Sequence, residues 1–124
     1  MSVTLPVKAA KLYKAWLSSK EHAAFTGGGA KVSSKTGGKF TAWDGYISGK
    51  NLELKANKKI VQSWRTSEFP EDAPDSTLEI TFEETNGKTK LSLYHYDLQK
   101  GDAKKYRDGW RDYYFEPMKQ YFGE

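Results

Sequence analysis

Residues 102–122 read DAKKYRDGWRDYYFEPMKQYF, and this stretch decides the fold. Its apolar and aromatic residues recur every three or four positions, which places them on one face of an α-helix. They are Tyr106, Trp110, Tyr113, Tyr114, Pro117 and Tyr121. Charged residues fill most other positions, so we predict an amphipathic helix from Asp102 to Phe122, with Asp102 as N-cap. A helix face with this many aromatic residues must pack against a broad apolar surface.

Pro117 interrupts this helix. Proline lacks a backbone N–H and clashes with the carbonyl group one turn back, so we expect the helix to bend near Tyr113.

The middle of the chain supplies the apolar surface. From Ala30 onward the hydrophobic period changes from three and four to two; Leu78, Ile80 and Phe82 alternate with polar residues, as in a half-buried strand. We predict strands at 3–5, 30–34, 39–43, 46–55, 58–66, 76–84 and 88–97. Asn86-Gly87 is a strong hairpin signal, and Thr36-Gly37-Gly38 and Asp44-Gly45 indicate further tight turns.

Two short helices are predicted before these strands. Pro6 suits a first helical turn, and the spacing of Leu12, Tyr13, Trp16 and Leu17 is typical of an amphipathic helix. Ser18 and Glu21 have the spacing of a capping box, which starts a second helix that ends at Gly27-Gly28-Gly29. The whole chain, 1–124, is therefore expected to be one α+β domain of helix-grip type, in which a curved antiparallel sheet wraps around the long C-terminal helix.

Composition excludes several functions. The chain has no cysteine, which excludes disulfides, thiolate metal sites and thiol catalysis. No apolar run approaches the ~20 residues that span a bilayer, and Met1 to Val7 lack the features of a signal peptide. We expect a soluble, cytoplasmic protein without membrane contact.

The net charge of +4 is unevenly distributed. Residues 1–60 carry eleven lysines and three acidic residues, a net charge of +8, whereas residues 61–124 have a net charge of −4. A lysine-rich half can steer an acidic partner toward it, and Lys31, Lys35, Lys39 and Lys58 are the candidates for such a surface. The alternative is that these lysines serve solubility alone. Residues 1–60 contain no arginine, whose guanidinium group is the usual bidentate donor to bases and phosphates. We therefore do not expect nucleic-acid binding.

Several stretches resemble one family. Gly37-Gly38-Lys39-Phe40, Asp44-Gly45, Ser48-Gly49, Ile60-Val61 and Trp64-Arg65 follow its order, as do Thr77 to Phe82 and the Asn86-Gly87 turn. The run from Gly109 to Phe115, GWRDYYF, is the most specific part. The chain is similar to the C-terminal domain of the activator of heat-shock-protein-90 ATPase, in the superfamily of START domains and birch-pollen allergens.

The resemblance implies a helix-grip fold, an apolar cavity between sheet and long helix, and contact with the chaperone in the stress response. In eukaryotic activators this is the second of two domains, and the motif of the first, principal stimulating domain does not occur in these residues. The resemblance therefore implies chaperone contact more than ATPase stimulation. The wider superfamily includes lipid carriers and a few cyclases.

The two histidines are the ordinary candidates for proton transfer near neutral pH. We expect His22, in a short polar helix, to be exposed. His95 shares a strand face with Leu91 and Leu93, which predicts that it points into the cavity, either as a ligand contact or as a histidine bonded to neighbouring groups. No triad or metal-ligand spacing accompanies either histidine, so neither catalysis nor a metal or other cofactor is expected.

Two functions remain open for a non-enzymatic, monomeric binding module. It can bind a heat-shock-protein-90 chaperone through the lysine-rich surface, as a co-chaperone. Alternatively it is a carrier or sensor that holds a small apolar or aromatic molecule, lipid-like or polyketide-like, in its cavity. The predicted cavity walls are Phe40, Trp64, His95, Trp110, Tyr113 and Tyr114. The same aromatic side chains can instead fill the core themselves.

Overall fold

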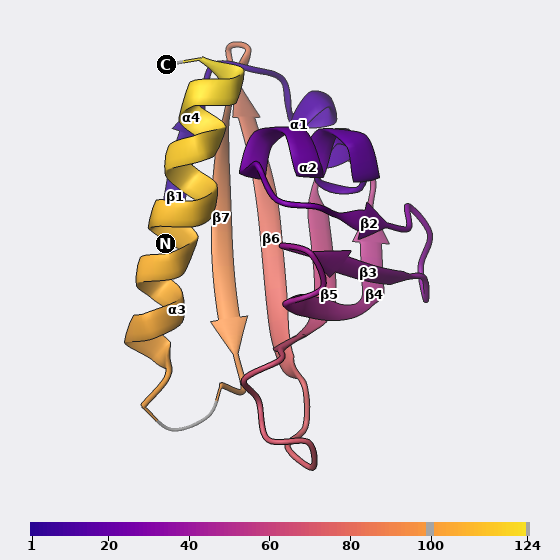
Figure 1. The fold of residues 1–124 in the computed structure, drawn as a ribbon. Helices are drawn as coiled ribbons and strands as arrows, with labels where there is room; N and C mark the ends of the chain where they lie inside the picture. The colour runs from indigo at the N-terminus through magenta and orange to yellow at the C-terminus, as the bar shows by residue number, and fades with distance from the viewer. Residues whose placement is uncertain (99–100, 124) are drawn as a thin grey trace.

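Seven strands form an open antiparallel sheet in the order β1-β7-β6-β5-β4-β3-β2 (Figure 1). The structure is a computed structural model that describes residues 1–98 and 101–123. Its strands are β1 (Ser2–Leu5), β2 (Lys31–Val32), β3 (Lys39–Ala42), β4 (Ile47–Lys55), β5 (Lys59–Thr66), β6 (Ser76–Thr85) and β7 (Lys88–Tyr96). Strands β2 to β7 follow one another as hairpins, whereas β1 pairs with the last strand, Val3 lying opposite Leu91. The predicted α+β helix-grip fold is confirmed.

The strands bury alternate residues, as their period of two predicts. On β5, Ile60, Gln62 and Trp64 are buried, and Arg65 on the other face bonds to Asp75 in the loop that follows. The Asn86-Gly87 turn has positive φ at both residues, 54° and 79°, as a primed hairpin turn requires.

Five of the predicted strands are shorter than expected, and those at 46–55, 58–66 and 88–97 are each shorter by a single residue. The strand predicted at 30–34 is reduced to Lys31–Val32, and the one predicted at 39–43 ends at Ala42. The second shortening has a clear cause, because Trp43 has a φ of 52° and lies outside the extended region.

Two short helices, α1 (Ala9–Trp16) and α2 (Ser19–Thr26), connect β1 to β2. Ser18 caps α2 as predicted, since its hydroxyl oxygen accepts from the Glu21 N–H at 3.2 Å. Gly27, with φ 83°, ends this helix in the left-handed region, where glycine is favoured.

The C-terminal helix is one continuous ribbon that runs alongside β7 (Figure 1). It consists of α3 (Ala103–Trp110), a π-helical turn η1 (Arg111–Phe115) and α4 (Glu116–Phe122). Asp102 occupies the N-cap position, but its side chain makes no capping bond. The π-helical turn ends two residues before Pro117 and contains Tyr113, near which the sequence predicted a bend of the helix. Its wider backbone spacing relieves the clash that proline imposes on the preceding turn.

The π-helical turn also changes which aromatic residues are buried. Tyr106, Trp110, Tyr114 and Met118 form a buried stripe with a spacing of four, and Phe115 is buried as well. Tyr113 and Tyr121, predicted on the same face, are 60% and 43% exposed. The stripe covers the sheet and also meets α1, where the Trp16 ring lies 5.1 Å from that of Tyr114.

Candidate functional site

A cleft of about 400 Å³ lies between the C-terminal helix and the strands β4 and β5. The β-sheet side contributes Trp43, Tyr46, Ile47 and Trp64. The helix contributes Lys105, Tyr106, Gly109, Trp110, Tyr113 and Tyr114. The walls are almost wholly apolar, and seven of these ten residues are tryptophan or tyrosine. A cavity of this size and lining suits a small apolar molecule.

Four of the six predicted cavity residues line this cleft: Trp64, Trp110, Tyr113 and Tyr114. Phe40 lies elsewhere, buried on β3 close to Gly49. His95 borders a second, smaller hollow of about 260 Å³ that also touches Tyr106 and Trp110.

Sequence reasoning missed several walls of the cleft. Tyr106 was recognisable, since it precedes Trp110 by four residues on the same helix face. Trp43 and Tyr46 flank the Asp44-Gly45 turn, and nothing in the local pattern indicates that this turn folds back against the helix.

An ion pair lies at the edge of the cleft. Lys105 Nζ lies 2.8 Å from Glu68 Oε2, and the Tyr46 hydroxyl donates to the same carboxylate. The bond from Lys105, and then that from Tyr46, lowers the pKa of the Glu68 carboxyl. This part of the rim thus carries a balanced charge.

His95 is bonded at both ring nitrogens. The Trp110 indole N–H, which can only donate, lies 3.1 Å from Nδ1, so that nitrogen is the acceptor. Nε2 therefore carries the proton and donates to Ser76 Oγ at 2.8 Å, while the Ser76 hydroxyl donates to the Trp64 carbonyl at 2.6 Å. This chain of bonds ends on the backbone and leaves neither a free base nor an activated serine. His95 joins the helix to the sheet.

His22 is buried, contrary to the exposed position predicted for it; only 2% of its surface is accessible. Its Nδ1 lies 2.9 Å from the Trp16 carbonyl and must donate, so Nε2 accepts from the Tyr114 hydroxyl at 2.9 Å. The helix α2 looks polar in sequence, but tertiary packing turns this residue inward. Burial lowers the pKa of His22 to about 4.

Three of the four predicted surface lysines lie on the β2–β3 hairpin. Lys31 lies opposite Thr41, and Lys39 lies opposite Lys50 of β4. Since residues paired across strands share a face and that face alternates along a strand, this register places Lys31, Lys39 and Lys50 on the outer face of the sheet. Lys35 lies in the connecting turn, and Lys58 lies apart, in the turn between β4 and β5. We call Lys31, Lys35, Lys39 and Lys50 the lysine surface.

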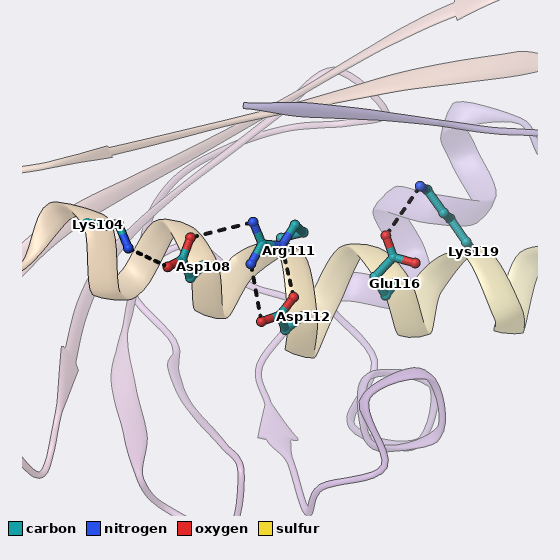
Figure 2. Close-up of polar contacts among 6 residues, drawn as sticks. All are labelled: Lys104, Asp108, Arg111, Asp112, Glu116 and Lys119. Atoms are coloured by element: carbon teal, nitrogen blue, oxygen red, sulfur yellow. Dashed lines mark hydrogen bonds and ion pairs between the residues drawn. The ribbon is translucent and has the colours of Figure 1, made fainter.

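No ion pair involves a member of the lysine surface within residues 1–98 and 101–123. Lys39 and Lys50 face each other directly, a like-charge arrangement that destabilises a sheet. The C-terminal helix differs: there Lys104, Arg111 and Lys119 pair with acidic neighbours on the same helix (Figure 2). The positive charge of the lysine surface is thus not balanced by ion pairs among the residues that the structure describes.

Asn51 fixes the turn that carries Lys35. Asn51 is fully buried, and its side-chain amide donates to the carbonyl groups of Ser33 and Lys35 at 2.8 and 3.0 Å. Gln62 donates in turn to Asn51 Oδ1 at 2.8 Å. The lysine-bearing turn is therefore held from inside the core.

Other kinds of site lack support in the part of the chain that the structure covers. Residues 1–98 and 101–123 contain no cluster of three or more His, Asp and Glu side chains that could hold a metal ion. Within the same residues, no helix has the length and apolar character needed to cross a membrane.

A curved antiparallel sheet that grips a long C-terminal helix over an aromatic cleft defines a protein of the helix-grip class. The family model described as Activator of Hsp90 ATPase homolog 1-like protein matches residues 6–123. The chain belongs to this family, which confirms the resemblance predicted from the sequence.

Relatives of this chain agree with the family assignment. The human protein named Activator of 90 kDa heat shock protein ATPase homolog 1 is 35% identical over 113 residues, which are 91% of this chain and 33% of that protein. The Saccharomyces cerevisiae protein named Hsp90 co-chaperone AHA1 is 27% identical and covers 97% of this chain. The chain thus spans about a third of the length of these relatives, 33% and 36%.

The crystal structure of an Hsp90 activator from Plasmodium falciparum has the same fold. It superposes with a TM-score of 0.87 at 24% identity and covers 98% of this chain and 94% of that one.

Proposed function

We propose that this chain is a non-enzymatic binding module that contacts a chaperone of the Hsp90 class in the cytoplasm, with the lysine surface as its contact. The observation that carries the proposal is the unbalanced charge at Lys39 and Lys50, which face each other across β3 and β4. A protein that keeps such a pair at a cost in stability gains when an acidic partner neutralises it. Membership of the activator family supports a chaperone as that partner.

The turn that carries Lys35 is already held in place, which should lower the entropic cost of binding a partner. Asn51 and Gln62 hold the turn that carries Lys35, so little ordering remains to be done when a partner binds. Lys58 and the other lysines of the first half add to the long-range attraction, which acts on the rate of encounter and weakens with salt.

The test is a two-dimensional amide NMR titration with the Hsp90 homologue of the same organism. We expect saturable, salt-sensitive shifts around Lys31, Lys35, Lys39 and Lys50. The double variant Lys39→Glu/Lys50→Glu should lose most of this binding. Lys88→Glu/Lys104→Glu changes the net charge equally on β7 and α3, where the side chains are also exposed, and should bind normally. An unchanged spectrum at high chaperone concentration contradicts the proposal.

A second candidate function is the binding of a small apolar or aromatic molecule, favoured by the cleft of about 400 Å³. Its aromatic lining offers stacking and edge contacts to a flat ligand, and its size suits a compact one. Titration with a panel of aromatic and lipid-like compounds, followed through the indole N–H signals of Trp64 and Trp110, tests it. Shifts at these two signals are expected; their absence across the panel contradicts this second function.

A further inference from the structure

The turn between β3 and β4 has an unusual backbone. Trp43, Asp44 and Gly45 have φ values of 52°, 57° and 91°, three consecutive residues in the left-handed region. Glycine adopts this region freely and aspartate tolerates it, but a bulky residue such as tryptophan rarely does. Strained backbone of this kind persists only where surrounding contacts enforce it, and it concentrates at functional sites.

The enforcing contacts come from the glycine stretch after α2. Asp44 accepts from the Gly29 N–H at 3.1 Å, and the Asp44 N–H donates to the Gly29 carbonyl at 2.9 Å. The Trp43 ring packs directly on Gly28, where an added Cβ would lie 2.6 Å from a ring carbon. At Gly29 an added Cβ would lie 2.3 Å from the Asp44 carboxylate. Gly28 and Gly29 therefore form a surface on which Trp43 and Asp44 pack, and a side chain at either glycine would disrupt this packing. We call this surface the glycine seat.

The other side of Trp43 faces the C-terminal helix. Its ring lies 5.7 Å from that of Tyr113 and 6.5 Å from that of Tyr114, both edge-on. These tyrosines belong to the π-helical turn, a second backbone irregularity of a kind found often at functional sites. Two irregular segments from distant parts of the chain thus meet at the cleft through their aromatic side chains.

Trp43 also differs from the other tryptophans. Trp16, Trp64 and Trp110 are only 2–3% exposed, whereas Trp43 is partly exposed. It is a cleft wall carried by a turn of a few residues, held on one side by the glycine seat and on the other by edge contacts with tyrosine.

We propose that Trp43 is the gate of the aromatic cleft, that the bonds between Asp44 and Gly29 latch it, and that the cleft admits flat aromatic molecules when the turn releases it. This inference rests on the second candidate function. Release relieves the left-handed strain at Trp43, which lowers the cost of opening. The admitted molecule takes over the ring contacts that Trp43 makes with Tyr113 and Tyr114, so a planar aromatic body is the chemistry that fits.

The latch can be tested without a ligand by acrylamide quenching of tryptophan fluorescence, which reports on the partly exposed Trp43. Gly29→Ala displaces the Asp44 carboxylate, and Asp44→Ala removes it. Both variants should show a several-fold larger quenching constant than the wild type. Asp72→Ala removes a carboxylate from the exposed loop between β5 and β6, outside the cleft, and should quench like the wild type. Circular dichroism checks that each variant is folded. If Gly29→Ala or Asp44→Ala does not fold, Gly28→Ala replaces it in the experiment.

Entry to the cleft is tested with N-phenyl-1-naphthylamine, an uncharged aromatic fluorophore, in stopped-flow association experiments. The latch variants should bind the probe several-fold faster than the wild type and the Asp72→Ala control. Equal association rates and equal quenching in all of these proteins overturn the gate while leaving the cleft as a binding site. Absence of probe binding to every folded variant overturns both the ligand function and the gate.

Discussion

The Tyr114 hydroxyl donates to Nε2 of His22 at 2.9 Å, and this bond joins the π-helical turn to α2 inside the core. Both groups are buried, and the other nitrogen of His22 is bonded to the Trp16 carbonyl. Burial raises the pKa of Tyr114, which keeps its hydroxyl protonated as the donor.

Tyr114→Phe should destabilise the protein by about 1–3 kcal/mol, because it leaves a buried acceptor on His22 without a partner. Tyr113→Phe is the matched control. Tyr113 is 60% exposed, so its loss of a hydroxyl should change the free energy of unfolding by less than about 0.5 kcal/mol. Urea unfolding of both variants checks this, and equal stabilities would show that the His22 bond contributes nothing.

Stability should fall as the pH drops from 7 toward 4. Burial lowers the pKa of both His22 and His95 to about 4, whereas an unfolded histidine titrates near 6.5. The unfolded state therefore binds more protons between these values, so acid favours unfolding. Each histidine should remove about 2 kcal/mol between pH 7 and pH 5. Urea unfolding across this range measures the loss, and a flat profile would mean that both histidines protonate freely in the folded protein.

Lys50→Glu should separate stability from function. Glutamate at this position lies directly opposite Lys39, so a like-charge pair becomes an opposite-charge pair that stabilises the sheet by about 0.2–1 kcal/mol. The same change should weaken chaperone binding, since it removes charge from the lysine surface. Thermal unfolding measures the change in stability, and the NMR titration measures the change in chaperone binding. Loss of both stability and binding would mean that Lys50 acts through packing rather than charge.

Substitution by alanine should have opposite effects on stability at Gly49 and Gly109. At Gly49 an added Cβ would lie 1.8 Å from the Ser63 carbonyl oxygen, so Gly49→Ala must break the pairing of β4 with β5 and should cost several kcal/mol. Gly109 lies inside α3, where an added Cβ would make an ordinary contact 4.0 Å from a Tyr113 ring carbon, so Gly109→Ala should stabilise the helix by about 0.5–1 kcal/mol. Thermal unfolding of the pair checks both signs.

Most of the fold could be predicted because local pattern and packing agree. The alternation on β5 and β6 identifies their buried faces, and Asn86-Gly87 identifies the hairpin beside them. The Asp44-Gly45 turn was predicted as well, but the burial of His22 and the packing of Trp43 could not be predicted in this way. Their positions depend on Tyr114 and Gly28, which lie far away along the chain, and no local period encodes such contacts.

The candidate site was predictable to the extent that its residues share a helix face or a strand face. Trp64, Trp110 and Tyr114 follow from period alone. Lys50 became part of the lysine surface only through the register of β3 with β4, which sequence patterns do not give. Tyr113 was predicted on the buried stripe, and the π-helical turn explains its exposure.

The place of β1 at the edge beside β7 has a consequence for how the sheet assembles. Residues 2–5 hydrogen-bond with residues 89–92, which the ribosome makes much later. Strand β1 must therefore wait unpaired until β7 has been synthesised, and its docking closes the longest loop in the sheet. Contacts so distant in sequence slow folding, so β1 docking is the step at which a nascent chain stays open to chaperones for longest.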